Sequence, residues 1–159
     1  MNYRNLEVWK RSLDLTADIY RLTKQLPKEE LFGLSDQMRR AVVSIPSNIA
    51  EGAGRNSDKE FKRFLFIANG SIAELETQLL ICEKLDFADQ ADIYSLLRQT
   101  EEIQKMIFGL KNRIDLIADS HLYQRRNYEK NSCAYIRRGR AGHERGHSKR
   151  DTDGGFSAL

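Results

Sequence analysis

Four basic residues near the middle of the chain have the types and spacing of a phosphate-binding surface. Lys62 and Arg63 follow Lys59 by three and four residues, so the three side chains would share one face of a helix. Arg55 lies in the connection just before that helix. Such a surface binds RNA phosphates with salt-sensitive affinity and few base contacts. An ordinary solvated helix face carries the same residues, and the sequence leaves both interpretations open.

A second basic pair, Arg39 and Arg40, has a structural interpretation as well as an RNA-binding one. The planar guanidinium matches a carboxylate, which favours Arg in partly buried ion pairs. Glu51, Glu74 and Glu76 are natural partners across a packed interface. We therefore predict that these five residues act in structural or interface contacts, as do Pro46 and Asn48, which would shape the bent helix against its neighbour.

Nucleophilic catalysis has little support in the sequence. Ser44, Ser47 and Asn48 flank Pro46, where short polar side chains can satisfy backbone groups that a bend leaves free. A serine nucleophile needs a base within reach, and His121 lies far along the chain. No G-x-S-x-G elbow is present. We predict that the protein is not an enzyme.

Metal and cofactor sites have equally weak signals. His143 and His147 have ligand-like spacing, but a structural zinc site needs four ligands, and no C-x-x-C pair accompanies them. The Glu-x-x-His motifs of di-iron bundles are missing, and the glycines at 52 and 54 follow a helix rather than the strand that a phosphate loop requires. We predict no metal and no cofactor.

Apolar periodicity predicts four helices over residues 6–25, 35–54, 57–85 and 90–123. Ser35 is the expected N-cap of the second helix, which contains Pro46 and ends near two glycines. Ser57 and Glu60 form a capping box at the start of the third. The sequence thus predicts an all-α fold, an antiparallel up-down four-helix bundle with a kinked second helix and a disordered C-terminal tail.

The first of these helices carries two apolar lines instead of one. One line contains Leu6, Trp9, Leu13, Ala17 and Tyr20, and the other contains Val8, Leu15, Ile19, Leu22 and Leu26. Because one bundle core covers one stripe of a helix, the second line indicates contacts beyond the bundle. Head-to-tail contacts between identical subunits close into rings, so we expect a homo-oligomer.

Charge divides the chain into a bundle domain, residues 1–124, and a basic tail, residues 125–159. The first part has 17 Lys and Arg against 19 Asp and Glu, whereas the tail has 9 against 4 and few apolar residues. Such a composition predicts disorder, and the tail is either an RNA-binding arm or a non-selected extension. Two widely separated cysteines and the lack of a signal segment predict a cytoplasmic protein without a membrane partner.

Several motifs together resemble one known family. Residues 37–52 read Gln-x-Arg-Arg-Ala-x-x-Ser-Ile-x-x-Asn-Ile-Ala-Glu-Gly, and residues 26–34 read Leu-Pro-x-Glu-Glu-x-Phe-Gly-Leu. With Tyr3-Arg-Asn-Leu-Glu-Val-Trp9 and the pattern from Glu60 to Leu79, these motifs resemble the four-helix bundle proteins encoded in intervening sequences of 23S rRNA genes. The similarity covers about residues 3 to 120. The basic tail departs from the family, whose members usually finish with the fourth helix.

The resemblance implies an assembly and a class of partner. Relatives include accessory proteins of diversity-generating retroelements, which form pentameric rings and bind a reverse transcriptase and RNA. Our hypothesis is a non-enzymatic, ring-forming bundle that binds structured RNA or an RNA-handling protein such as a reverse transcriptase. The alternative is a protein–protein adaptor bundle with no nucleic-acid role, which the near-neutral bundle favours.

Overall fold

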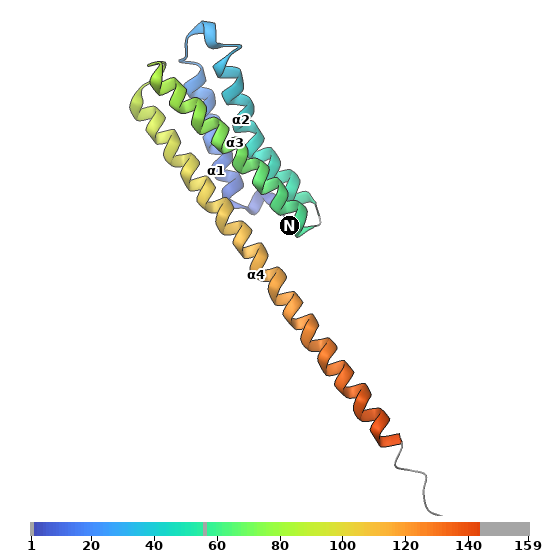
Figure 1. The fold of residues 1–159 in the computed structure, drawn as a ribbon. Coiled ribbons are helices and arrows are strands. Elements are labelled where there is room, and N and C mark those ends of the chain that lie inside the picture. The colour runs from blue at the N-terminus through green and yellow to red at the C-terminus, as the bar shows by residue number, and fades with distance from the viewer. Residues whose placement is uncertain (1, 56, 144–159) are drawn as a thin grey trace, which may run out of the picture. The chain divides into compact units, whose positions relative to one another are not determined.

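The computed structural model describes residues 2–55 and 57–143, with side chains up to residue 117, and its elements are helical throughout (Figure 1). Four long helices form in the order α1 (Glu7–Thr23), α2 (Leu34–Gly54), α3 (Asp58–Lys84) and α4 (Gln90–His143). Two short 3-10 helices precede α1 and α2, η1 (Tyr3–Asn5) and η2 (Lys28–Glu30). The prediction of an all-α four-helix bundle is confirmed.

Contacts divide the chain into two units, residues 1–116 and residues 117–159. The first unit holds the bundle. The fourth helix was expected to end near Tyr123, but its backbone continues to His143. No proline interrupts residues 118–143, so every residue there can donate its backbone N–H to the helix. Residues 144–159 of the predicted disordered tail lie outside the described residues.

The core of the bundle is built from one apolar stripe of each helix. On α1 the buried line is Val8, Leu15, Ile19 and Leu22, whereas Leu13 and Tyr20 of the other line remain 42% and 40% exposed. The core-forming residues of the remaining helices are Met38, Ala41, Val42, Ile45, Ile49, Phe61, Leu65, Ala68, Ile72, Leu75, Leu79, Ile93, Leu96, Ile103, Ile107 and Ile114. The first helix therefore has an apolar line that the bundle leaves uncovered.

Helix α2 begins two residues earlier than its sequence suggested, and the prediction of Ser35 as N-cap is wrong. Gly33 occupies the N-cap position. The backbone N–H of Leu34 donates to Glu30 Oε2 at 3.1 Å, so a carboxylate from η2 satisfies the first free donor of the helix. This leaves Ser35 inside the helix.

Pro46 lies inside α2 and does not end it, since the helix continues to Gly54. Short polar side chains near it bond to backbone carbonyl groups one turn back. Ser47 Oγ donates to the carbonyl oxygen of Val43 at 2.8 Å, and Asn48 Nδ2 donates to that of Ser44 at 2.8 Å. A bend at Pro46 stays a prediction.

Helix α3 begins where the capping box predicted. Ser57 is the N-cap, and its hydroxyl accepts from the backbone N–H of Glu60 at 3.4 Å. Among the described residues, α3 is the one helix long and apolar enough to cross a membrane by length and composition, but the core helix of a bundle has the same properties. Its buried residues, which include Phe61, Leu65 and Ile72, show that it forms the bundle core.

Candidate nucleic-acid interface

The predicted basic patch lies where α2 ends and α3 begins. Gly52 allows this approach, because a Cβ at that position would lie 2.6 Å from Phe64 Cβ and 3.0 Å from Phe61 Cδ2. Arg55 follows directly and holds its guanidinium 5.6 Å from the centre of the Phe64 ring. The close packing thus brings Arg55 to the first turns of α3, where Lys59, Lys62 and Arg63 lie.

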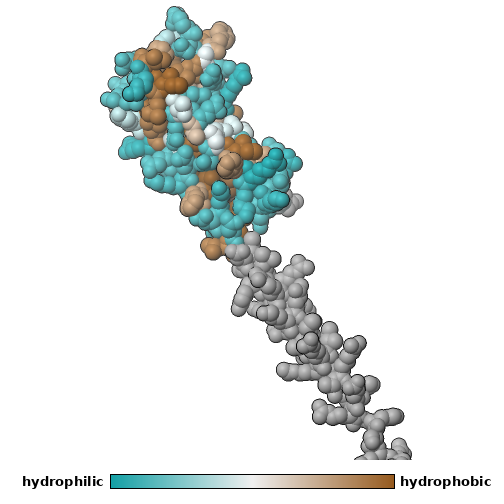
Figure 2. All heavy atoms as spheres, viewed as in Figure 1, coloured by the Kyte–Doolittle hydropathy of each residue, from teal (hydrophilic) through white to brown (hydrophobic). Residues whose placement is uncertain are grey.

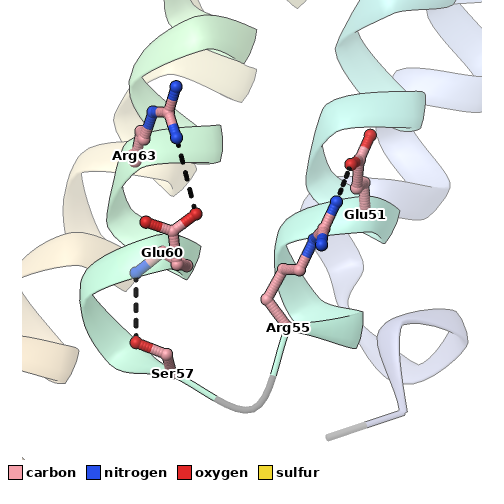
Figure 3. Close-up of polar contacts among 5 residues, drawn as sticks. All are labelled: Glu51, Arg55, Ser57, Glu60 and Arg63. Carbon is pink, nitrogen blue, oxygen red and sulfur yellow. Dashed lines mark hydrogen bonds and ion pairs between the residues drawn. The ribbon is translucent and has the colours of Figure 1, made fainter.

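Carboxylates accompany three of these four cations. Arg55 pairs with Glu51 at 2.6 Å and Arg63 pairs with Glu60 at 3.6 Å, each within its own helix (Figure 3). The hydrogen bond that Arg55 donates to Glu51 is the main cause that raises the pKa of Arg55 above its usual value. The positive charge of both guanidinium groups is therefore partly compensated.

The two lysines of the patch differ from each other. Lys62 forms an ion pair with Asp115 of α4 and is only half exposed. Lys59 is exposed and has no ion pair among the described residues. The single face predicted for Lys59, Lys62 and Arg63 is thus divided among a contact to α4, a contact within α3 and a free cation.

Arg39 and Arg40 find partners other than the predicted glutamates. Arg39 Nε donates to Thr23 Oγ1 at 2.9 Å, and its guanidinium lies 5.4 Å from the centre of the Tyr20 ring. Arg40 pairs with Asp36 at 2.9 Å. Within the chain, the predicted pairing with Glu51, Glu74 and Glu76 is wrong, because α2 turns Arg39 toward α1.

The three glutamates make their own contacts. Glu51 pairs with Arg55, Glu74 accepts from Gln78 at 3.3 Å, and Glu76 accepts from Gln104 of α4 at 3.4 Å. Glu51 thus forms an ion pair, and Glu74 and Glu76 form hydrogen bonds, with residues other than Arg39 and Arg40. The structural or interface role of the three glutamates stays a prediction.

A pocket that sequence reasoning missed lies at the other end of α2. It has a volume of about 250 Å³ and lies between the end of α1, η2 and the start of α2. Its lining residues are Thr23, Lys24, Leu26, Pro27, Lys28, Leu31, Ser35 and Arg39. The sequence contained one signal for this pocket, because Lys24 and Lys28 lie on either side of Pro27 and so place two cations where α1 ends. We name it the α1–α2 pocket.

An apolar groove follows the uncovered line of α1. It has a volume of about 360 Å³ and is lined by Tyr3, Trp9, Leu13, Thr16, Val43, Pro46, Ser47 and Ala50. The rings of Tyr3 and Trp9 meet edge to face with centroids 5.2 Å apart. Pro46 therefore lines this groove together with residues of α1. Asn48 instead donates hydrogen bonds to Ser44, one turn back in α2.

Apolar side chains also reach the surface on the other side of the bundle. Figure 2 shows them in separate patches among hydrophilic residues on the face formed by α3 and α4. Phe66 of α3 is 69% exposed and Phe108 of α4 is 64% exposed. The ammonium of Lys111 lies 5.9 Å from the centre of the Phe66 ring. Phe66 and Phe108 therefore lie outside the core.

Metal ligands and the serines near Pro46 were the remaining candidates for chemistry in the sequence. No group of three or more His, Cys, Asp or Glu side chains in this part of the chain is arranged to hold a metal ion. Ser44 Oγ accepts hydrogen bonds from Asn48 at 2.9 Å and from Ser71 at 2.9 Å. His121 was considered above as a general base, and its side chain lies outside the described part of the chain. The same holds for the side chains of His143 and His147.

Comparison with known proteins gives one family and one informative structure. A family model described as 23S rRNA-intervening sequence protein matches residues 4–109. A crystal structure of a protein of unknown function from the S23 ribosomal protein family of Bacteroides thetaiotaomicron is 27% identical. It aligns over 65% of this chain and 97% of that one, with a TM-score of 0.62. No curated protein matches.

Proposed function

Because the chain belongs to the family of 23S rRNA-intervening sequence proteins, we propose that it is a non-enzymatic, self-associating bundle that binds structured RNA in the cytoplasm. The observation that carries this proposal is the cluster of cations at the α2–α3 end. Arg55 and Arg63 are 56% and 69% exposed, so their ion pairs are solvated. Exposed pairs of this kind are worth about 0–1 kcal/mol, and RNA phosphates can displace the carboxylates. Lys59 needs no such exchange.

Self-association supplies the affinity that one such patch lacks. The apolar groove beside Leu13 and Val43, which are 42% and 40% exposed, is a surface that a second copy can cover. A ring, a pentamer by resemblance, would repeat the cation cluster around its axis. Several weak phosphate contacts on one RNA would then act together, because each later contact is intramolecular.

The first experiment measures RNA binding of the full chain at two salt concentrations. A fluorescently labelled RNA hairpin is titrated with the wild type and with a variant carrying Gln at Arg55, Lys59, Lys62 and Arg63. We expect the variant to bind at least about tenfold more weakly and with a shallower salt dependence. Equal binding by both proteins would show that the patch has no role. A chain ending at residue 124 separates the contribution of the basic tail.

The second experiment measures the size of the particle. Sedimentation velocity at micromolar concentration should give an oligomer for the wild type and a monomer for Val43→Glu, which places a charge in the groove. A wild-type monomer under these conditions would contradict self-association.

A protein–protein adaptor is the second candidate function. The observation that favours it is the partial neutralisation of the predicted patch, where Glu51, Glu60 and Asp115 each accompany a cation. In that case a reverse transcriptase or another protein would occupy the apolar surfaces. The patch variant would then retain its partner, and the wild type would bind no RNA at physiological salt.

A further inference from the structure

We propose that the α1–α2 pocket binds a phosphate group of the RNA backbone, with Arg39, Lys24 and Lys28 as its cations and Ser35 as a hydroxyl donor. The proposal rests on the RNA-binding function proposed above and adds a second, separate contact point to it. Three independent features of the pocket support it: its charge, the orientation of Arg39 and the hydrogen-bonding state of Ser35.

The charge of the pocket is positive and uncompensated. Three of its lining residues are cations and none is an acid. Among the described residues, none of Lys24, Lys28 and Arg39 takes part in an ion pair. The two pockets beside α4 differ, since Asp18 and Asp92 line one and Asp14 and Glu102 line the other. Three cations around one cavity repel each other, and a bound anion removes that repulsion.

Arg39 is held in place through its Nε atom, and the two terminal nitrogens of its guanidinium stay available for a ligand. Its Nε is bonded to Thr23 Oγ1 at 2.9 Å, and its guanidinium lies over Tyr20 at 5.4 Å from the ring centre. These contacts fix the plane of the group before any ligand arrives. No described residue accepts a hydrogen bond from its terminal nitrogens, which are the atoms that bind phosphate oxygens bidentately. A preoriented arginine loses less conformational entropy on binding.

Ser35 gives the second, uncharged indication of a ligand. The residue is 1% exposed, lines the pocket, and its Oγ has no hydrogen-bond partner among the described residues. Buried hydroxyl groups are normally bonded, and an exception at a pocket wall points to a missing partner. A phosphate oxygen accepts a hydrogen bond from a serine hydroxyl, so the same ligand would satisfy both Ser35 and Arg39.

The size of the pocket and its place on α2 agree with a backbone phosphate. A water molecule takes about 30 Å³ of liquid volume, so a cavity of about 250 Å³ admits a phosphate group. The group carries several acceptor oxygens, which suits three cations and a hydroxyl better than a single carboxylate does. Ser35 and Arg55 are twenty residues apart in the sequence, which corresponds to about 30 Å along a helix. One bundle would thus contact a structured RNA at two distant points.

The test uses the full chain, a labelled RNA hairpin and five single variants. Arg39→Gln should weaken binding by about tenfold and Lys28→Gln by about threefold to tenfold, with the salt slope reduced by about one unit in each. Ser35→Ala should weaken binding by about threefold without lowering the melting temperature. Arg98→Gln is the matched control, because Arg98 is exposed, lines none of the pockets described above and forms no ion pair among the described residues.

Arg39→Lys keeps the positive charge but removes the planar guanidinium that can bind a phosphate bidentately. It should recover part of the affinity that Arg39→Gln loses. Lys28 is exposed, so Lys28→Gln is expected to fold even where substitution of Arg39 disturbs the bundle. The proposal is overturned if Lys28→Gln and Ser35→Ala bind RNA as tightly as Arg98→Gln does.

A second arm uses inorganic phosphate and distinguishes the two sources of the anion. Phosphate is titrated into the ¹⁵N-labelled full chain at constant ionic strength, and the Arg39 Nε–H and Ser35 amide signals are followed. Saturable shifts that disappear in Lys28→Gln support a phosphate site. Shifts in a wild type that binds no RNA would overturn the RNA part of the proposal together with the proposed function. Absence of shifts, with RNA binding unaffected by the variants, would overturn the site alone.

Discussion

The two ends of α2 carry similar numbers of cations in different electrostatic settings. At the α2–α3 end, Arg55 and Arg63 each meet a glutamate of their own helix. In the α1–α2 pocket, Lys24, Lys28 and Arg39 have no ion pair among the described residues. The first group was evident from spacing in the sequence, and the second was not. Available positive charge therefore depends on where the acids lie more than on how closely the cations follow each other.

The setting also differs in geometry. The cations at the α2–α3 end lie on exposed helix faces and can change partners at little cost. In the pocket, Thr23 and Tyr20 orient Arg39, and Ser35 contributes a hydroxyl without a partner. A flat, paired surface suits weak contacts that a ring multiplies, whereas an oriented, unpaired pocket suits a single defined contact.

The largest expected effect concerns the packing that holds the α2–α3 end together. Gly52→Ala would place a Cβ 2.6 Å from Phe64 Cβ, so the two helices must separate. We expect the free energy of unfolding to fall by about 1–3 kcal/mol. Urea denaturation followed by circular dichroism measures it.

Gly54→Ala is the matched control for that substitution. A Cβ at Gly54 meets nothing within 4 Å, so the change should stabilise the helix end by about 0.4–1 kcal/mol through the unfolded chain. If Gly52→Ala proved as stable as Gly54→Ala, then close helix packing would not be what places Arg55 beside α3.

The next effect tests whether the carboxylates reduce RNA binding at the α2–α3 end. Glu51→Gln with Glu60→Gln removes the partners of Arg55 and Arg63. We expect RNA affinity to rise about threefold to tenfold at low salt, because the freed cations release additional counterions on binding. Fluorescence anisotropy at two salt concentrations measures both the affinity and its slope.

Glu101→Gln is the corresponding control, since Glu101 pairs with Lys105 on α4 at 2.6 Å. It changes the net charge in the same direction without touching either end of α2. An equal gain from Glu101→Gln would mean that overall charge, and not local pairing, explains the difference between the two ends.

Two serines extend the comparison to stability. Ser57 caps α3 and accepts from the Glu60 N–H, so Ser57→Ala should cost about 1 kcal/mol. Ser35 Oγ has no partner, so Ser35→Ala should leave stability unchanged or raise it by up to about 1 kcal/mol. Thermal denaturation of both variants without ligand measures the difference. A loss in Ser35→Ala as large as that in Ser57→Ala would show that its hydroxyl is already bonded.

The sequence predicted the helix start that a known cap pattern determines and missed the one that depends on the geometry of the preceding turn. The third helix starts at its capping box because Ser57 and Glu60 are three residues apart and need no other part of the chain. Ser35 looked equally suited to a cap, but Glu30 of η2 satisfies the first donor of α2 and the helix starts at Leu34. The competing carboxylate arrives from a 3-10 turn whose geometry periodicity does not encode.

The same reasoning explains which partners of Arg39 and Arg40 could be predicted from the sequence. Arg40 pairs one turn back with Asp36, a contact that spacing alone contains. The partners of Arg39 are Thr23 and Tyr20, sixteen and nineteen residues earlier in the chain. They depend on how α2 is rotated against α1, and so does the pocket. Helix periodicity identifies the buried face of each helix, but not which residues at the edges of two faces will meet.

The last prediction uses a buried thiol near the start of α2 to compare the two ends. Cys82 Sγ lies 3.8 Å from Met38 Sδ, and burial raises the pKa of its thiol to about 11. At neutral pH the folded protein therefore holds the unreactive thiol, and alkylation requires local or global opening. The unfolded thiol ionises near pH 9, so between about pH 9 and pH 11 the unfolded state binds fewer protons.

The contribution of Cys82 to stability is thus complete below about pH 9 and is lost as pH rises toward 11. In a Cys133→Ser background, iodoacetamide should modify Cys82 far more slowly than a free thiol at pH 8, and Cys82→Ala should weaken the alkaline decline. Because Met38 lies one turn beyond Ser35, a phosphate bound in the α1–α2 pocket should slow the reaction further. If anions bound only at the α2–α3 end, local opening at Cys82 would be unchanged. Slower alkylation of Cys82 with phosphate, but not with chloride, would therefore assign the bound anion to the α1–α2 pocket. This measurement needs no substitution at either end of α2.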